Sequence, residues 1–288
     1  MPIQTSCRRG VQAPQRGLTT ALKSLCLVAL ITGTVCNAAR ADFQAGWDAY
    51  ERGDFVTAYN EWQPLAEKGD TRAQFNIGVM YDEGKGLAQD RSKAIDWWTR
   101  AAKSGDAQAQ HNLGLAYLAG TGVSQNHAEA VSWLKQAAGH GLVRSQYALG
   151  RMYDYGFGVE KNENEAAKWI LMAAEQGFDK AQYNMGKRYR DGVGVPKNKE
   201  AEAKWFLAAA ERGHARAQHH VGLRYLKGDG VKKDLVAAFM WLTLSARAGD
   251  KVAARERENL LSQISGAQRK EAESMADKWQ PKATSANG

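Results

Sequence analysis

Residues 73–105 read AQFNIGVMYDEGKGLAQDRSKAIDWWTRAAKSG, and the same pattern recurs with a step of 36 residues, the difference between Trp133 and Trp97. A fixed period of this length, with no catalytic motif inside it, indicates a stack of supersecondary units that presents a surface. The recurring tryptophans are Trp97, Trp133, Trp169, Trp205 and Trp241, and the recurring glutamines are Gln74, Gln110, Gln146, Gln182 and Gln218.

Each unit is predicted to be a pair of helices. Ala73, Ile77 and Tyr81 follow one another at four-residue spacing, so they share one stripe of a first helix. Gly78 recurs in the middle of that helix, where glycine costs about 1 kcal/mol relative to alanine. We therefore expect another backbone to approach this position too closely for a methyl group.

A glycine turn is expected to join the two helices. Gly84 and Gly86 suit positive φ angles, Asp90 is a good N-cap for the second helix, and Gly105 is expected to end that helix. Two later units have a glutamate three residues after the cap, which resembles a capping box: Asn126 with Glu129, and Asn162 with Glu165.

The full pattern, AQ-x₃-G-x₂-Y-x₂-G-x-G-[VL]-x₂-[DN]-x₆-W-x₃-AA-x₂-G, resembles the Sel-1-like repeat, a relative of the tetratricopeptide repeat. The resemblance implies an all-α fold, a right-handed α/α superhelix (solenoid) of helix-turn-helix repeats used for protein contacts, commonly in exported bacterial proteins. Departures from the pattern are small: Glu202 replaces an alanine, and Ser245 replaces the first alanine of the AA pair.

The predicted organisation has five segments. They are a signal peptide (1–41), a tetratricopeptide-like hairpin (42–72), five repeats (73–108, 109–144, 145–180, 181–216 and 217–249), capping helices (250–280) and a disordered tail (281–288). Unlike the repeats, the first hairpin lacks the glycine turn, and the last pair is rich in charge, as expected for the ends of a solenoid.

The first 41 residues are predicted to be an export signal. A basic, acid-free segment precedes an apolar run from Leu25 to Cys36, and Ala39-Arg40-Ala41 has the small-x-small pattern of a cleavage site. The run is shorter than the roughly 20 residues that span a bilayer. We therefore expect cleavage after Ala41, a periplasmic or secreted protein and no integral membrane span. A retained signal, which would make a membrane-tethered adaptor, is the alternative.

Removal of this segment changes the charge and cysteine content. The whole chain has a net charge of +8, but residues 1–41 hold five basic residues and no acids, so the remainder carries (39 − 5) − 31 = +3. The overall charge therefore does not indicate a nucleic-acid partner. All three cysteines, Cys7, Cys26 and Cys36, also leave, so neither disulfides nor thiol chemistry are expected.

The variable positions of the first helices are candidates for partner binding. Positions 72, 75 and 79 and their counterparts share one face, and the resemblance places first helices on the concave side of a solenoid. This face combines basic residues with aromatic rings, which suits an acidic or carboxylate-ended protein or peptide. The alternative is that the aromatic row packs between helices and the basic row is only solvated. The candidates are Arg72, Phe75, His111, Arg144, Tyr147, Arg151, Lys180, Tyr183, Lys187, Arg190, Arg216 and His219.

Catalytic, cofactor and metal motifs are not convincing in this sequence. Ser132-x-x-Lys135 matches a β-lactamase nucleophile motif by spacing alone, without the Ser-Asp-Asn and Lys-Thr-Gly partners. Neighbours such as His219 and His220 point about 100° apart on a helix, which does not suit a shared metal. No catalytic residue, cofactor or metal is predicted.

The sequence thus favours a non-enzymatic scaffold or adaptor of the bacterial envelope that binds a protein or peptide on its concave surface. The alternative is an envelope β-lactam- or peptidoglycan-binding protein or hydrolase, similar to the cysteine-rich Sel-1-like proteins.

Overall fold

The computed structural model describes residue 12 and residues 42–283, and the part that it describes contains fourteen helices and no strands. The predicted signal peptide, Gln12 excepted, and residues 284–288 of the predicted tail lie outside the described residues. The helices are α1 Phe43–Glu51, α2 Phe55–Glu67, α3 Thr71–Glu83, α4 Arg91–Lys103, α5 Ala107–Ala119, α6 His127–Gly139, α7 Val143–Tyr155, α8 Glu163–Glu175, α9 Asp179–Asp191, α10 Lys199–Ala210, α11 Ala215–Lys227, α12 Leu235–Arg247, α13 Lys251–Leu260 and α14 Gly266–Lys278. The predicted all-α architecture of consecutive helix pairs is confirmed.

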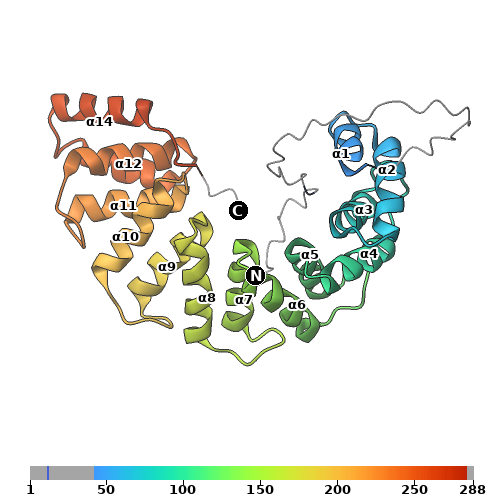
Figure 1. Cartoon of the computed structure of the whole chain (residues 1–288). Coiled ribbons are helices and arrows are strands. Elements are labelled where there is room, and N and C mark those ends of the chain that lie inside the picture. Colours follow the sequence, from blue (N-terminus) through green and yellow to red (C-terminus); the bar gives the residue numbers. More distant parts are fainter. Residues whose placement is uncertain (1–11, 13–41, 284–288) are drawn as a thin grey trace, which may run out of the picture. The chain divides into compact units, whose positions relative to one another are not determined.

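The chain divides into two compact units, Met1–Gln125 with α1–α5 and Asn126–Gly288 with α6–α14. Within each unit, helices that follow one another in sequence pack against one another as far as α13, and α14 packs against α12 (Figure 1). The division lies inside the second predicted repeat, between its two helices. We call the two parts unit 1 and unit 2.

The mid-helix glycine contacts a large side chain of its own repeat. A Cβ atom added to Gly78 would lie 2.5 Å from Nε1 of Trp98, and one on Gly186 would lie 2.6 Å from Cδ1 of Phe206. At these two glycines the closest atoms belong to an α4 or α10 side chain and not to the expected backbone, whereas at Gly150 the Ala166 carbonyl oxygen would also lie 3.0 Å from the added atom. Ile170 meets Gly150 and Leu242 meets Gly222 in the same way.

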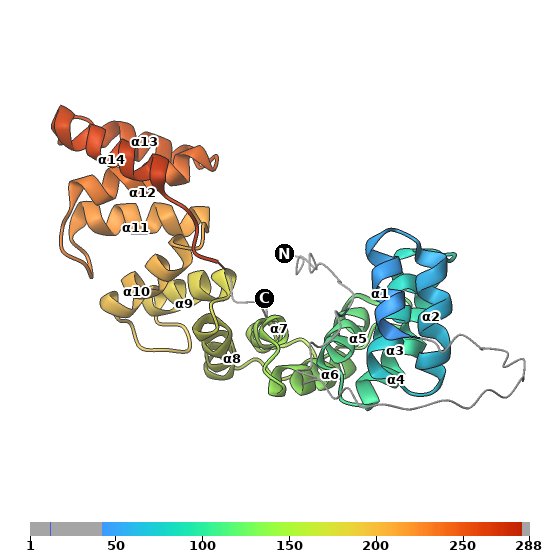
Figure 2. The same ribbon diagram turned by 45° about the horizontal axis from the view of Figure 1, so that its top comes forward.

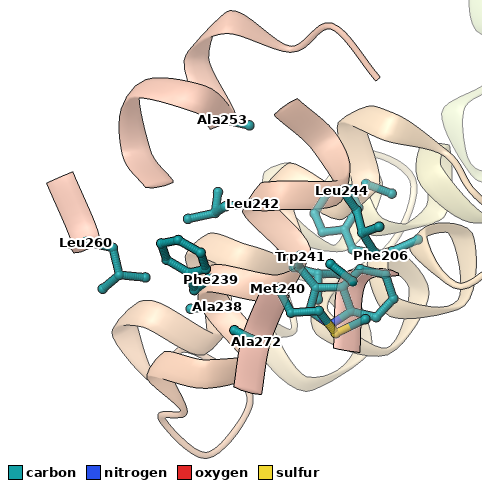
Figure 3. Close-up of a cluster of buried hydrophobic side chains, with 14 of the residues drawn as sticks. Phe206, Ala238, Phe239, Met240, Trp241, Leu242, Leu244, Ala253, Leu260 and Ala272 are labelled. Carbon is teal, nitrogen blue, oxygen red and sulfur yellow. The ribbon is translucent and has the colours of Figure 1, made fainter. Parts of the chain in front are cut away.

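A large and almost fully buried side chain lies one residue after the periodic tryptophan. Trp97 and Trp205 are only half-buried, whereas Trp98 and Phe206 are 1% and 0% exposed. The repeat pattern in the sequence does not identify this position, because its residue type changes from repeat to repeat. Its occupants are Trp98, Leu134, Ile170, Phe206 and Leu242, and Figure 3 shows Phe206 and Leu242 in the core of unit 2.

The recurring glutamine joins each first helix to the second helix that precedes it. Gln74 Nε2 donates to the carbonyl of Ala66 at 2.9 Å, and Gln182 Nε2 donates to the carbonyl of Ala174 at 3.1 Å. The same carbonyls also accept from the turn that ends the helix, as Ala66 O does from Gly69 N at 3.0 Å, so each buried glutamine supplies an additional donor. The same bond recurs from Gln110, Gln146 and Gln218.

Both glycines of the turn adopt the predicted positive φ angles, and the second also meets the preceding repeat. Gly86 has a φ of 72°, and a Cβ atom there would lie 2.8 Å from the carbonyl carbon of Phe55, the first residue of α2. Gly122 approaches the carbonyl of Arg91, the first residue of α4, in the same way. The turn thus packs against main-chain atoms of the preceding second helix.

The predicted N-caps of the second helices are confirmed. The Asp90 carboxylate accepts from Lys93 N at 3.0 Å, and the Asn162 side chain accepts from Glu165 N at 3.0 Å. The reciprocal bond from Glu165 or Glu129 does not form in the described part, so those capping boxes are incomplete. A complete box occurs instead at Ser265 and Gln268, at the start of α14.

The two ends of the helix array differ from the repeats. In unit 1, α1 and α2 form a hairpin in which Trp62 Nε1 donates to the carbonyl of Phe43 at 3.1 Å. In unit 2, α13 and α14 both pack against α12 (Figure 2), and Trp279 makes an edge contact with Trp241 at 6.2 Å between ring centroids. The last helices therefore cover apolar surface of α12.

Two ion pairs, each with one buried partner, join neighbouring repeats of unit 2. Glu202, the acidic departure from the repeat pattern, is 2% exposed and pairs with Arg224 of α11. Arg188 of α9 pairs with Asp154 of α7. Arg188 and Arg224 occupy equivalent positions, so each arginine reaches back to an acid of the repeat before it.

Candidate functional site

Consecutive first helices of unit 2 touch one another through polar and aromatic side chains on one face. Asn184 Nδ2 on α9 donates to the Tyr147 hydroxyl on α7 at 2.8 Å. The Tyr183 ring stacks on His214, the N-cap of α11, with centroids 4.3 Å apart. His219 Nδ1 lies 3.4 Å from Oδ2 of Asp250, the N-cap of α13. We call this surface of α7, α9, α11 and the start of α13 the first-helix face.

Arg151 is held between two tyrosines of this face. Its Nη2 donates to the Tyr155 hydroxyl at 2.7 Å, its Nη1 donates to the Tyr147 hydroxyl at 3.4 Å, and its guanidinium lies over the Tyr155 ring. Burial favours a lower pKa for Arg151, but interactions with Tyr147 and Tyr155 outweigh it and raise the pKa. The guanidinium is thus a fixed positive charge beside the exposed ring of Tyr155.

The other predicted cations fall into two groups. Lys180, Lys187 and Arg216 form no ion pair with other described residues, and Lys180 and Arg216 are exposed. Arg190 instead donates to both carboxylate oxygens of Asp191, at 2.8 and 3.0 Å. The first group can therefore accept an anion without breaking an existing pair.

The predicted row of aromatic residues is buried in unit 1 and partly exposed in unit 2. Phe75 and His111, in unit 1, are 1% and 2% exposed and belong to the packing between helices. Tyr147, Tyr183 and His219, in unit 2, are half-buried and border solvent. Arg72, also predicted, lies over the Phe43 ring and pairs with Asp70 at 3.3 Å, while Arg144 is half-buried on α7.

A pocket of about 520 Å³ opens between α11 and the start of α13. It brings together the predicted residues Tyr183, Arg216 and His219, and His219 Nε2 is buried without a hydrogen-bond partner in the described part of the chain. The other lining residues are Ala215, His220, Ala248, Gly249, Asp250, Lys251 and Val252. This mixture of cations, rings and one acid suits the carboxylate or amide groups of a polypeptide.

The charges of the pocket are set by burial and hydrogen bonding. Burial, with smaller effects of nearby cations such as Arg190, lowers the pKa of His220 to about 4, so this ring is neutral at physiological pH. Burial acts to raise the pKa of Asp250, but donation from the backbone amides of Ala253 and Val252 prevails and lowers it. Asp250 is therefore a carboxylate beside Arg216 and Lys251 at neutral pH.

The Ser132 and Gly120 motifs, considered in the sequence for catalysis and dinucleotide binding, do not belong to the first-helix face. Among the described residues, no cluster of three or more His, Cys, Asp or Glu side chains could hold a metal ion. Ser132 and Lys135 are exposed on α6, away from the first-helix face. Gly120 and Gly122 form the repeat turn after α5. No described helix is both long and apolar enough to cross a bilayer.

Sequence reasoning missed Asn184 and Asp250. Asn184 occupies a row with Asn76 and Asn112 at the repeat spacing, and reading that row would have identified it. Asp250 is an N-cap at the start of a first helix, as are Asp70 and Asp106. The intervening caps Leu142 and Phe178 make no side-chain cap bond, so that row is irregular.

Comparison with known proteins assigns the repeats. A family model described as Sel1 repeat matches residues 71–106, 107–142, 143–178, 179–214 and 215–250, beginning two residues before the predicted unit boundaries. Each matched segment starts at or beside the first residue of a first helix.

Two solved structures share the fold. One is c5321, a protective antigen present in uropathogenic Escherichia coli strains and displaying an SLR fold; it is 32% identical, with a TM-score of 0.75 over 80% of this chain and 50% of that chain. The other is a Sel1 repeat protein from Oxalobacter formigenes, 30% identical, with a TM-score of 0.70 over 83% of this chain and 100% of that chain.

A curated relative, DAP3-binding cell death enhancer 1 of Mus musculus, is 36% identical over 50 residues, 17% of this chain. The match covers 10% of that protein, so it indicates that the two proteins share a repeat sequence over this short stretch.

Proposed function

Because the chain belongs to the Sel1 repeat family, generally a protein-interaction fold, we propose that it is a non-enzymatic scaffold that binds an acidic protein or peptide on the first-helix face of unit 2. The observation that carries the proposal is that Lys187 and Arg216, which form no ion pair with described residues, lie on the same first-helix face as the half-buried rings of Tyr147 and Tyr183. Aromatic anchors beside cations are typical of energetically dominant interface positions.

The proposed location is the bacterial envelope or its exterior. Support comes from the sequence of residues 1–41, with its basic segment, apolar run and Ala39-Arg40-Ala41. Fractionation of the source cells, followed by mass spectrometry of the N-terminus, tests this. A chain that begins at Asp42 outside the cytoplasm is expected; the full-length chain confined to the cytosol would contradict export.

The binding proposal is tested by charge reversal on matched surfaces. The double variant Lys187→Glu/Arg216→Glu is expected to recover at least tenfold less partner from an envelope extract, and elution by salt is expected because exposed charge contacts are screened. The control is Lys168→Glu/Lys204→Glu, which makes the same charge change on second helices of unit 2, α8 and α10. Equal loss in both variants, with both folded, would refute a role for the first-helix face.

A further inference from the structure

Gln12, far from the repeats in sequence, makes three hydrogen bonds with the first helices of unit 1. Its main-chain N donates to Asn76 Oδ1 at 2.7 Å, and its carbonyl accepts from Asn76 Nδ2 at 3.3 Å. Its side-chain Nε2 donates to Asp106 Oδ2 at 2.6 Å. Asn76 lies on α3, and Asp106 is the N-cap of α5.

The Asn76 contact recognises a peptide unit rather than a residue type. Its side-chain amide accepts from the N–H and donates to the C=O of the same residue, as a neighbouring β-strand would. Asn76 is 0% exposed and lies directly before the buried Ile77 and Gly78, so its side chain is held in place by the core. Such a bond pair accepts almost any amino acid other than proline, which lacks the N–H.

The Asp106 contact adds chemical selectivity. One carboxylate oxygen accepts from Ala109 N at 2.7 Å and thereby caps α5, while the other accepts from Gln12. The carboxylate is therefore fixed by the helix terminus and faces the bound segment. It suits a side chain that donates a hydrogen bond and disfavours a carboxylate at the same position.

The next repeat carries a matching group. Asn112 is the counterpart of Asn76 on α5, is 3% exposed, and its Nδ2 has no hydrogen-bond acceptor in the described part of the chain. Leaving a buried amide donor unpaired costs about 1–3 kcal/mol. A polypeptide that continued past Asn76 along the first helices would supply a carbonyl for this donor.

We propose that Asn76, Asn112 and Asp106 form a binding site for an extended polypeptide segment carrying a hydrogen-bond-donating side chain, and that the chain's own Gln12 occupies this site in the intact chain. The proposal is independent of the basic first-helix face, since it involves α3 and α5 of unit 1 and a neutral amide ligand.

The test compares two forms of the protein with one probe peptide. The probe is residues 8–16, RRGVQAPQR, acetylated and amidated at its ends and labelled for fluorescence anisotropy. A chain that begins at Asp42 retains all fourteen described helices, which circular dichroism verifies. We expect this form to bind the probe, and the intact 288-residue chain to bind it at least tenfold more weakly. No binding to the shortened chain, or equal binding to both forms, would overturn the proposal.

Variants assign the contacts within the site. Asn76→Leu is expected to weaken binding of the probe at least tenfold, whereas Asn60→Leu, the same change at an exposed position of α2 in unit 1, leaves it unchanged. Equal effects of the two variants would refute recognition by Asn76.

A paired change of probe and protein separates recognition from a purely structural role of Asp106. A probe with Glu in place of Gln12 is expected to bind the shortened chain at least tenfold more weakly, because two carboxylates then face each other. Asp106→Asn keeps an N-cap side chain on α5. With this variant, the increase in the logarithm of the dissociation constant caused by the Glu probe is expected to fall by at least half. If Asp106→Asn lowers binding of both probes equally, the proposed contact is refuted.

Discussion

The contact between the mid-helix glycine and the large side chain of its own repeat sets the spacing of each hairpin. In the Gly186 example, a methyl group would overlap Cδ1 and Cε1 of Phe206, at 2.6 and 2.7 Å. Phe206 is 0% exposed and closely surrounded, so its ring has little room to move. Close packing makes overpacked cores unstable even though alanine favours helix more than glycine does.

Gly186→Ala is therefore expected to lower the free energy of unfolding of unit 2 by about 1–3 kcal/mol, measured by urea denaturation. The matched control is Gly139→Ala, near the end of α6, where an added Cβ meets nothing within 4 Å. That change is expected to stabilise by about 0.5–1 kcal/mol, because it restricts the unfolded chain. A neutral or stabilising effect of Gly186→Ala would contradict the packing argument.

His220 makes the stability of unit 2 depend on pH. Its ring stacks on Phe206 with centroids 4.5 Å apart, and burial, followed by the charge of Arg190, lowers its pKa from 6.5 to about 4. Protonation thus favours the unfolded state, so stability is lost as the pH falls from about 6.5 towards 4.

His220→Phe is expected to remove this loss while retaining a ring at the contact. Urea denaturation at pH 7 and pH 4.5 should show that the variant loses about 1–2 kcal/mol less than the wild type, a figure reduced for partial solvent screening. His140→Phe, at an exposed position, is the control, and its free energy of unfolding should change between pH 7 and pH 4.5 as that of the wild type does. Parallel pH curves for wild type and His220→Phe would contradict the assignment.

At the scale of the helices, the sequence predicted the boundaries of the second helices more accurately than those of the first helices. Asp90 and its counterparts recur as good N-caps, and the glycine turn marks where each first helix ends. First helices begin two residues before the predicted units because Asp70 and Asp106 cap them. Those caps did not stand out because Leu142 and Phe178 replace them in later repeats.

The terminal helix α14 covers the apolar surface that α12 would otherwise expose. Ala272 and Ala276 of α14 are 0% and 4% exposed and belong to the same core cluster as Phe239 and Leu260. Met275, on the same helix, is 42% exposed.

Ala272→Asp is expected to lower the free energy of unfolding by about 3 kcal/mol or more, because a carboxylate cannot be buried there without a partner. Increased binding of a hydrophobic dye should accompany the loss, since undocking of α14 exposes α12. Met275→Asp places the same charge on the solvent side of α14 and should change stability by no more than about 0.5 kcal/mol. Similar losses of unfolding free energy in both variants would show that α14 does not shield the apolar surface of α12.

At the scale of the whole molecule, the repeat is the recurring structural unit. The period and glycine turns were enough to predict the all-α helix pairs, because each feature repeats with a local physical cause. The candidate site was less predictable: the cations and rings could be placed on one face, but burial of Phe75 and His111 depends on neighbouring helices. The contact of Gln12 with Asn76 spans 64 residues, and no local pattern marks it.

Deletion of residues 179–214, the repeat that contains α9 and α10, is expected to leave a folded protein with unchanged helical content per residue. Repeats contact mainly their neighbours, and Arg224 would take the place of Arg188 opposite Asp154. Circular dichroism and urea denaturation measure the outcome. Deletion of α9 together with the turn that follows it, residues 179–196, breaks the pairing of helices and should abolish cooperative unfolding of unit 2. Equal disruption by both deletions would argue against a modular repeat.

The glutamine bond and the second turn glycine both meet main-chain carbonyl groups of the preceding repeat, whereas the mid-helix glycine meets a side chain of its own repeat. Of these three contacts, only the one within a repeat depends on the size of a side chain, whereas the two that cross its border meet carbonyl groups that every amino acid possesses. A gene segment encoding one repeat can therefore be duplicated or exchanged with these contacts intact, whereas ion pairs such as Glu202 with Arg224 are specific to the repeats that form them. Such an array can change its length and its surface in evolution while conserving the way its parts join.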